Sequence, residues 1–430
     1  MRRLSTVLVA LGTAISLILP ATAAFAADPD SHDTAAGRHV GYFTQWGIYD
    51  RGYLVKNVVD SGQIDHLTHL NYAFGNTNEQ GQCFEANQAG VGDAWADYQR
   101  RFTADQSVDG QADAYDQPLA GNFNQLKKLK AAHPDLKIMF SLGGWTWSKY
   151  LSNAALPENR ANYVKSCIDM FIKGNLPKIG GEPQGGDGAA AGIFDGFDID
   201  WEWPASEGNT GNVFRPEDKA NYVALLEEFR KQLDAVGSGY ELSIYGAADP
   251  DKIAAGFDVP NLMKSVDFVN VQGYDLNGAW DATTNHQAQI HSPDADPNPK
   301  KWSADLAIQS WKDAGAPADK LVLGLPAFGR GWTGVPNTDN GLYQTSTGAA
   351  PGKYEAGIDD YKLVKDKPGT VYRDEDNMAV WKYDGSNFWS YDDADMIRKK
   401  MAWVAEQGLG GSMIWSLDGD DGSLVAAMDS

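Results

Sequence analysis

Cysteine is scarce in this sequence, with only Cys83 and Cys167 among 430 residues. Cys83 lies in a polar stretch, whereas Cys167 lies on a predicted helix beside apolar residues. A disulfide needs a specific separation and orientation of the two residues, which spacing along the chain does not supply. We therefore predict that the two cysteines remain unpaired, and keep a disulfide as the alternative.

Basic residues are also few, because 36 Lys and Arg stand against 58 Asp and Glu, for a formal net charge of −22. Such an acidic chain is repelled by phosphate backbones and anionic lipids. This argues against nucleic acid or a membrane surface as a partner. The seven histidines form no H-E-x-x-H or similar cluster, and the acidic turn at 418–422 departs from a calcium-loop pattern. We predict no metal site and no cofactor.

Long apolar runs are missing after the first twenty residues. At the start, Arg2 and Arg3 precede the apolar run 4–19, and Ala24-Phe25-Ala26 suits a signal peptidase. We predict a signal peptide over 1–26, a loose N-terminal segment over 27–38 and a secreted protein. A monomer is the default expectation for such a protein.

What the sequence does contain is an alternation of apolar strands and helices over nearly all the remaining chain. Eight such units predict a closed α/β barrel, the (β/α)8 or TIM barrel. The predicted barrel covers 39–332 and 390–430, and a small α+β insertion between strands seven and eight covers 333–389. The expected strands begin near residues 39, 66, 137, 194, 241, 266, 321 and 411.

The stretch 194–204 (FDGFDIDWEWP) places acids inside a run that otherwise resembles a buried strand. Because side chains alternate along a strand, Asp198, Asp200 and Glu202 share one face, at steps of ~6–7 Å. A solvated strand face or a calcium site could also explain an acid row. The flanking aromatic residues favour burial, where like charges and desolvation keep some of the acids protonated, as acid/base chemistry requires.

Other polar and aromatic residues follow predicted strands. They are Tyr274 with Asp275, Arg330 and Trp415. Barrel enzymes carry out their chemistry where the strands end. These positions are therefore candidates for the same site as the acid row.

Residues 195–202 match the D-x-x-D-x-D-x-E signature of glycoside hydrolase family 18, the chitinases, and the chain resembles that family over most of 39–420. Residues 141–144 (SLGG) resemble its S-x-G-G motif, and 272–275 (QGYD) its M-x-Y-D motif, with Gln272 in place of Met. The resemblance implies hydrolysis of β-1,4 bonds between N-acetylglucosamine units in chitin and chito-oligosaccharides.

The resemblance also implies the roles of the catalytic residues. Glu202 would be the general acid and then the base, and Asp200 would orient the substrate's 2-acetamido group. Asp198 would share a proton with Asp200, and Tyr274 would donate its hydroxyl to the acetamido oxygen. The sugar's own acetamido oxygen would then replace a carboxylate nucleophile.

Further residues are predicted to bind the sugar chain. Trp415 would form the floor under the cleaved sugar, and Tyr42 part of the pocket wall. Arg330 would lie on the non-reducing side. The remaining predicted contacts are Asp275, Gln272, Gly144, Trp145 and Trp280, the two tryptophans being platforms on the leaving-group side.

Three other functions stay open at this stage. An endo-β-N-acetylglucosaminidase of the same family would cut glycoprotein glycans, and a chitin-binding lectin on the same barrel would lack the acid at Glu202. A two-carboxylate glycosidase would not need the acid row together with Tyr274.

Overall fold

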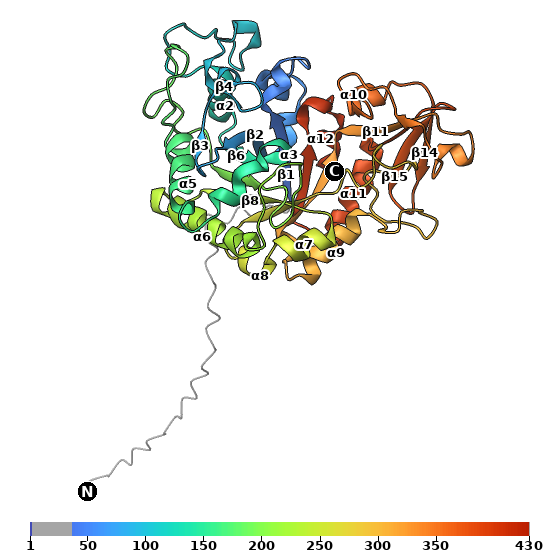
Figure 1. The fold of residues 1–430 in the computed structure, drawn as a ribbon. Helices are drawn as coiled ribbons and strands as arrows, with labels where there is room; N and C mark the ends of the chain where they lie inside the picture. Colours follow the sequence, from blue (N-terminus) through green and yellow to red (C-terminus); the bar gives the residue numbers. More distant parts are fainter. Residues whose placement is uncertain (2–36, 430) are drawn as a thin grey trace. The chain divides into compact units, whose positions relative to one another are not determined.

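The structure is a computed structural model that describes residue 1 and residues 37–429 (Figure 1). Apart from its first residue, the predicted signal peptide lies outside the described residues, as does nearly all of the segment 27–38. Residues 37–429 belong to one compact unit. None of the helices in the described part is long and apolar enough to cross a membrane.

Eight parallel strands close into a barrel, as predicted. Strand β1 pairs with both β2 and β17, which closes the ring, and the other neighbours follow one another in chain order. The barrel strands are β1 (Arg38–Thr44), β2 (His69–Thr77), β6 (Lys137–Gly143), β7 (Gly196–Asp200), β8 (Glu241–Gly246), β9 (Phe268–Val271), β10 (Leu321–Pro326) and β17 (Gly411–Trp415).

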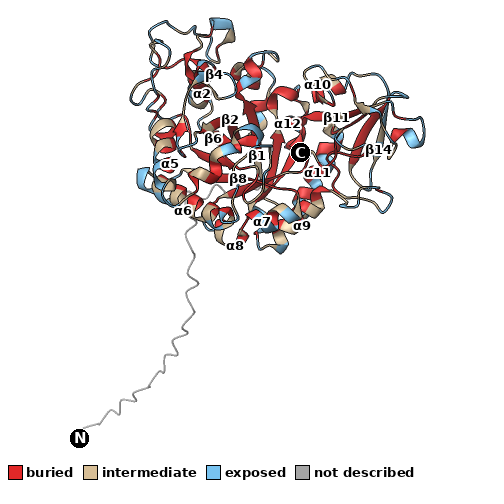
Figure 2. Cartoon of the chain, in the orientation of Figure 1, coloured by how far each residue is buried: buried red, intermediate tan, exposed pale blue. Residues whose placement is uncertain are grey.

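Helices lie outside the ring, and Figure 2 shows the strands and the helix faces against them as buried. On α6 the buried stripe includes Leu226, Phe229 and Leu233, each worth roughly 1.5–3 kcal/mol of hydrophobic stabilisation. The helices between barrel strands, and the last one, are α1 (Val55–Asp60), α2 (Gly121–Ala132), α3 (Gly144–Trp147), α4 (Leu151–Ala154), α5 (Arg160–Cys167), α6 (Asp218–Val236), α7 (Pro250–Gly256), α8 (Val259–Leu262), α9 (Ala304–Asp313), α11 (Ala394–Glu406) and α12 (Ser423–Met428).

A second sheet, with the short helix α10 (Tyr361–Val364), lies in the chain between β10 and β17. Its core of Trp332, Val335, Trp381, Tyr383 and Phe388 is separate from the barrel core. The sheet extends beyond 333–389 at both ends, so residues 328–332, expected in the barrel, belong to it. Its strands are β11 (Phe328–Thr333), β12 (Gly348–Ala349), β13 (Ile358–Asp360), β14 (Thr370–Asp374), β15 (Ala379–Tyr383) and β16 (Phe388–Tyr391).

The two cysteines form a disulfide, so the prediction that they are unpaired was wrong. Cys83 lies on β3 (Cys83–Phe84), which pairs antiparallel with the end of β2. That pairing brings Cys83 against the end of α5, where its Cα lies 5.1 Å from that of Cys167. The stretch expected to be an irregular polar loop contains two further short strands, β4 (Asn87–Gln88) and β5 (Gly92–Asp93).

We expect the double variant Cys83→Ser/Cys167→Ser to lose about 2–4 kcal/mol of unfolding free energy, because the bridge closes a loop of 84 residues in the unfolded chain. Thermal unfolding with and without dithiothreitol measures this. The reductant should lower the Tm of the wild type and leave that of the double variant unchanged. Equal Tm values for the two oxidised proteins would contradict the expectation.

Candidate active site

The acid row lies inside the barrel, at the carboxyl end of β7. Asp198 and Asp200 are buried on the strand itself, and Glu202 follows two residues after its last position. In the sheet register, Asp198 is flanked by Ser141 of β6 and Ser243 of β8. The predicted alternation therefore holds, but the third acid stands beyond the strand.

Asp198 is held by donors from four different strands. Its Oδ2 accepts from the hydroxyls of Tyr42 and Ser141, both at 2.7 Å, and its Oδ1 from Ser243 at 2.7 Å and Asn270 at 3.3 Å. Burial raises the pKa of Asp198, and these hydrogen bonds work against that rise by stabilising the carboxylate. Asp200 is not among its hydrogen-bond partners in the described residues.

Asp200 has an environment opposite to that of Asp198. Its Oδ1 is buried without a hydrogen-bond partner in the described part of the chain. Burial raises its pKa well above the usual range, and the charges of Glu202 and then Asp198 raise it further. The charge of Glu202 therefore disfavours ionisation of Asp200 more strongly than the charge of Asp198 does.

The backbone that carries Glu202 is held by the side chain of Ser148. The Ser148 hydroxyl donates to the carbonyl of Asp200 at 3.0 Å and accepts from the Glu202 amide at 2.9 Å. Burial raises the pKa of Glu202 to about 8, with Lys252 opposing the rise and Asp275 adding to it. A carboxyl group with this pKa holds a proton at neutral pH and can still release it, as a general acid must.

Tyr274 lies just beyond β9 and is buried beside Tyr245 of β8, with the two ring centroids 6.5 Å apart. Burial raises the pKa of Tyr274 well above its usual value, and the charge of Asp200 adds to the effect. The hydroxyl therefore stays protonated and remains a donor. The four predicted catalytic residues are thus gathered at one end of the barrel.

Trp415 belongs to an aromatic cluster at the same end. Its ring stacks on Phe74 at a centroid distance of 5.6 Å and lies 5.3 Å from that of Tyr42 and 6.4 Å from that of Trp46. The hydroxyl of Tyr42 is used by Asp198. Tyr42 therefore contacts both Trp415 and the acid row, and its place in the pocket wall stays a prediction.

The two glycines of the SLGG motif are required by close packing. A Cβ on Gly143 would lie 2.2 Å from the carbonyl oxygen of Asp200, and one on Gly144 would lie 2.5 Å from the Phe74 ring. Both residues also have positive φ, 113° and 74°. Gly144 thus shapes the site by allowing Phe74 to approach.

Asp275 and Arg330 connect the barrel to the second sheet. Arg330 is on β11, and its Nε donates to Asp275 Oδ1 at 2.7 Å, while its guanidinium lies 4.9 Å from the Trp280 ring. Gln272 lies at the end of β9, where its Oε1 accepts from the amide of Ala248 at 3.4 Å. Its side chain is therefore tied, at least weakly, to the backbone after β8.

Four tryptophans are unusually exposed for their size, and exposed aromatic surface is typical of ligand contacts. Trp280 is 60% exposed, Trp145 49%, Trp46 40% and Trp95 39%. Trp145 and Trp280 were predicted as platforms. Trp95, in the polar stretch after β2, was not among the predicted contacts.

Other contributors were also missed, namely Ser243, Asn270, Tyr245 and Lys252. The alternation in 241–247 (ELSIYGA) places Ser243 and Tyr245 on one face. Only the barrel register shows that this face meets Asp198. No comparable sequence signal marks Lys252.

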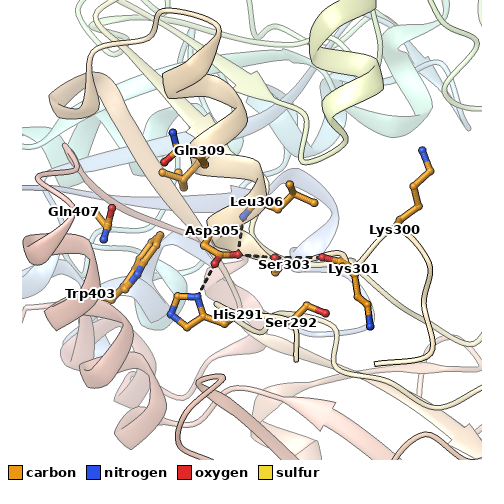
Figure 3. A pocket seen from close by; sticks show the side chains of 11 residues that line it. His291, Ser292, Lys300, Lys301, Ser303, Asp305, Leu306, Gln309, Trp403 and Gln407 are labelled. Carbon is orange, nitrogen blue, oxygen red and sulfur yellow. Dashed lines mark hydrogen bonds and ion pairs between the residues drawn. The ribbon is translucent and has the colours of Figure 1, made fainter. Parts of the chain in front are cut away.

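A separate hollow of about 540 Å³ lies between α9 and α11 and includes none of these residues (Figure 3). Its polar side chains are largely committed to the chain itself. His291 pairs with Asp305 at 2.6 Å, Lys301 donates to three backbone carbonyls, and Lys300 binds Asp251. We regard the hollow as a surface crevice. Across residues 37–429, no group of three or more His, Cys, Asp or Glu is arranged to hold a metal ion.

Comparison with known proteins identifies the family. The model of glycosyl hydrolases family 18 matches residues 38–420. The chain belongs to this family. The acid row and the barrel that holds it are therefore features of a family 18 domain.

The relatives include chitinase C of Streptomyces lividans, 41% identical over 91% of this chain, and chitinase A1 of Niallia circulans, 35% identical over 95%. The chain spans 59% and 60% of the length of these two proteins. Among solved structures, the catalytic domain of psychrophilic chitinase B from Arthrobacter TAD20 is similar, with a TM-score of 0.88 and 50% identity. That match covers 92% of this chain and 94% of the other.

We expect Glu202→Gln to stabilise the protein at alkaline pH. An unfolded glutamate titrates near pH 4.3, whereas Glu202 in the fold has a pKa of about 8. Between these pH values the folded state holds a proton that the unfolded state has lost, so the free energy of unfolding falls as pH rises. Above pH 8 the whole of this loss of stability is present.

Denaturant unfolding measures this effect. The variant should gain on the order of 1 kcal/mol or more over wild type at pH 9 and show no such gain at pH 4. Glu227→Gln, on the exposed face of α6, is the matched control and should show no pH-dependent gain. A difference for Glu202→Gln that is the same at both pH values would contradict the expectation.

Proposed function

We propose that this protein is a chitinase, which hydrolyses β-1,4 bonds between N-acetylglucosamine units with retention of configuration. The observation that carries the proposal is that, within residues 37–429, neither acid beside Glu202 is a free carboxylate on the opposite side of it. Asp200 lies behind it on the same strand face, and Asp275 is ion-paired with Arg330. The nucleophile must then come from the substrate, as the acetamido oxygen of an N-acetylated sugar.

In the first step, the acetamido oxygen forms a bond to C1 and the bond from C1 to the leaving oxygen breaks. Glu202 gives its proton to that oxygen, which leaves an oxazolinium ion and a Glu202 carboxylate. In the second step, water attacks C1, the bond from the acetamido oxygen to C1 breaks, and Glu202 takes the water's proton. The raised pKa of Glu202 suits both steps, because the group must hold and release one proton near neutral pH.

The other acids and Tyr274 orient the acetamido group. Asp200 has an unpaired buried oxygen and would bind the acetamido N–H and the developing positive charge. The side chain of Asp198 would keep its position during the reaction, because its oxygens already accept hydrogen bonds from four donors. Tyr274 would donate to the acetamido oxygen, so that it points at C1.

The aromatic and polar rim would hold the chain of sugars. Trp415 would lie under the sugar at the cleavage site, supported by Phe74. Asp275 and Arg330 would bind sugar hydroxyls on one side, with Gln272 and Gly144 shaping the wall. The exposed tryptophans offer stacking faces for further units, which suits a polymeric substrate.

We also propose that the protein is secreted, as a monomer, and that it acts without nucleic acid, membrane or cofactor. The proposal of export rests on the charged, apolar and small-residue pattern of 1–26.

A second candidate is removal of single N-acetylglucosamine units or cleavage of glycoprotein glycans. Removal of single units is favoured by similarity to a family 18 N-acetylglucosaminidase structure from Paenibacillus barengoltzii, 26% identical over 91% of this chain and 98% of the other, with a TM-score of 0.69. Product analysis on colloidal chitin, chitohexaose and an N-glycopeptide separates the possibilities. We expect soluble oligosaccharides from the first two and no cleavage of the third; release of the N-glycan alone would overturn the chitinase proposal.

We predict that Glu202→Gln lowers kcat on chitohexaose by roughly a thousandfold or more, because the amide can neither give nor take the proton. The variant should still bind the oligosaccharide, as measured by calorimetry, since the shape of the site is kept. Glu207→Gln, in the loop after β7, is the control and should keep wild-type turnover. Near-normal turnover by Glu202→Gln would show that another group supplies the proton.

We further predict that removing the acetyl group of the sugar at the cleavage position stops hydrolysis, since that group supplies the attacking oxygen. Kinetics on a defined oligosaccharide with glucosamine at this position tests the prediction, with the fully acetylated compound as control. Efficient cleavage of the deacetylated substrate would favour an enzymatic nucleophile instead.

A further inference from the structure

Lys252 is the cation whose charge acts on Glu202, at the end of the acid row. It lies half-buried on α7, with its ammonium 5.2 Å from the centre of the Trp203 ring, the residue that follows Glu202. Within residues 37–429, this ammonium has no hydrogen-bond or ion-pair partner. Holding an ammonium group in a partly desolvated position without an ion-pair partner costs free energy. Such a cost is a reason to look for a function of the charge.

Helix α7 is docked so that Lys252 cannot move far from the site. A Cβ on Gly256 would lie 2.4 Å from the carbonyl oxygen of Pro204, so the helix packs directly on the segment that carries Glu202. Asp249 caps the helix by accepting from the amide of Asp251 at 2.9 Å. Lys219 of α6 binds the carbonyl of Ala254 at 2.7 Å. The backbone around Lys252 is thus fixed on both sides.

Among the charged groups that act on Glu202, Lys252 is the one that stabilises its carboxylate form. Arg330, the other nearby cation, is neutralised by Asp275 at 2.7 Å. Burial lowers the pKa of Lys252, and the negative charges of Asp249 and Glu202 raise it. The groups that face Glu202 from the packed elements are Asp200 of β7, Tyr245 of β8, Tyr274 and Asp275 after β9, and Lys252 of α7.

We propose that Lys252 is a positioning residue whose charge, held over Trp203, sets the pH range in which Glu202 carries its transferable proton. The inference rests on the proposed role of Glu202 as acid and base. In the step that forms the oxazolinium ion, Glu202 becomes an anion. Lys252 favours that anion, so it assists proton donation and lowers the pH at which the free enzyme loses its acid.

The test is the pH dependence of kcat/KM on chitotetraose for a graded series at this position. Lys252→Met removes the charge that stabilises the Glu202 carboxylate. The alkaline limb of the profile, where kcat/KM falls as Glu202 loses its proton, should therefore move to higher pH by about one unit. Lys252→Arg should keep the wild-type limb, and Lys252→Glu should move it further upward than Lys252→Met. Lys300→Met, which removes an exposed lysine bound to Asp251 of the same helix, is the control and should leave the limb in place.

A merely structural role predicts a different result. It would lower kcat/KM equally at every pH, with an unmoved limb, and that outcome would overturn the inference. Lys252→Gln provides a second neutral variant, and a limb like that of wild type in either folded neutral variant would also overturn it. The proposed function is tested apart from this, because only an active Glu202→Gln enzyme would contradict the role of Glu202.

Discussion

Burial of Asp198 at the centre of the barrel is the constraint on which the rest of the site depends. A carboxyl group with no access to water is tolerated only where donors replace the solvent. Those donors come from β1, β6, β8 and β9, so they meet only when the ring has closed in the correct register. A slip of one residue would turn them to the outer face. Barrel closure and assembly of the site are therefore the same event.

From that centre outward, one functional group, the carboxyl, acquires three different properties. Asp198 is saturated with donors, Asp200 has a bare oxygen, and Glu202 stands at the mouth near a lysine. Their different access to solvent and to hydrogen-bond donors gives the three carboxyl groups different protonation behaviour. Enzymes use such differences to separate the roles of paired acids.

The sequence predicted those features that depend on local periodicity. Alternation identified Asp198, Asp200 and Glu202 as one face, and eight apolar strands indicated the barrel. What escaped prediction depends on which strands become neighbours. Ser243 and Asn270 are ordinary polar residues until the register places them on Asp198. Cys83 appeared to lie in a loose loop until β3 paired with β2 and brought it to α5. Family resemblance supplied roles that spacing alone could not.

Arg330 has a consequence for how this fold can be altered. It is held in place by ladder partners within the second sheet, Ile358 and Ser390, while its side chain reaches Asp275 at the mouth of the barrel. The insertion is therefore not a removable module. Deleting it to obtain a minimal barrel would free the arginine and leave Asp275 as an unbalanced carboxylate beside Glu202. Any shortening of this region, in the laboratory or in evolution, must first provide another cation there.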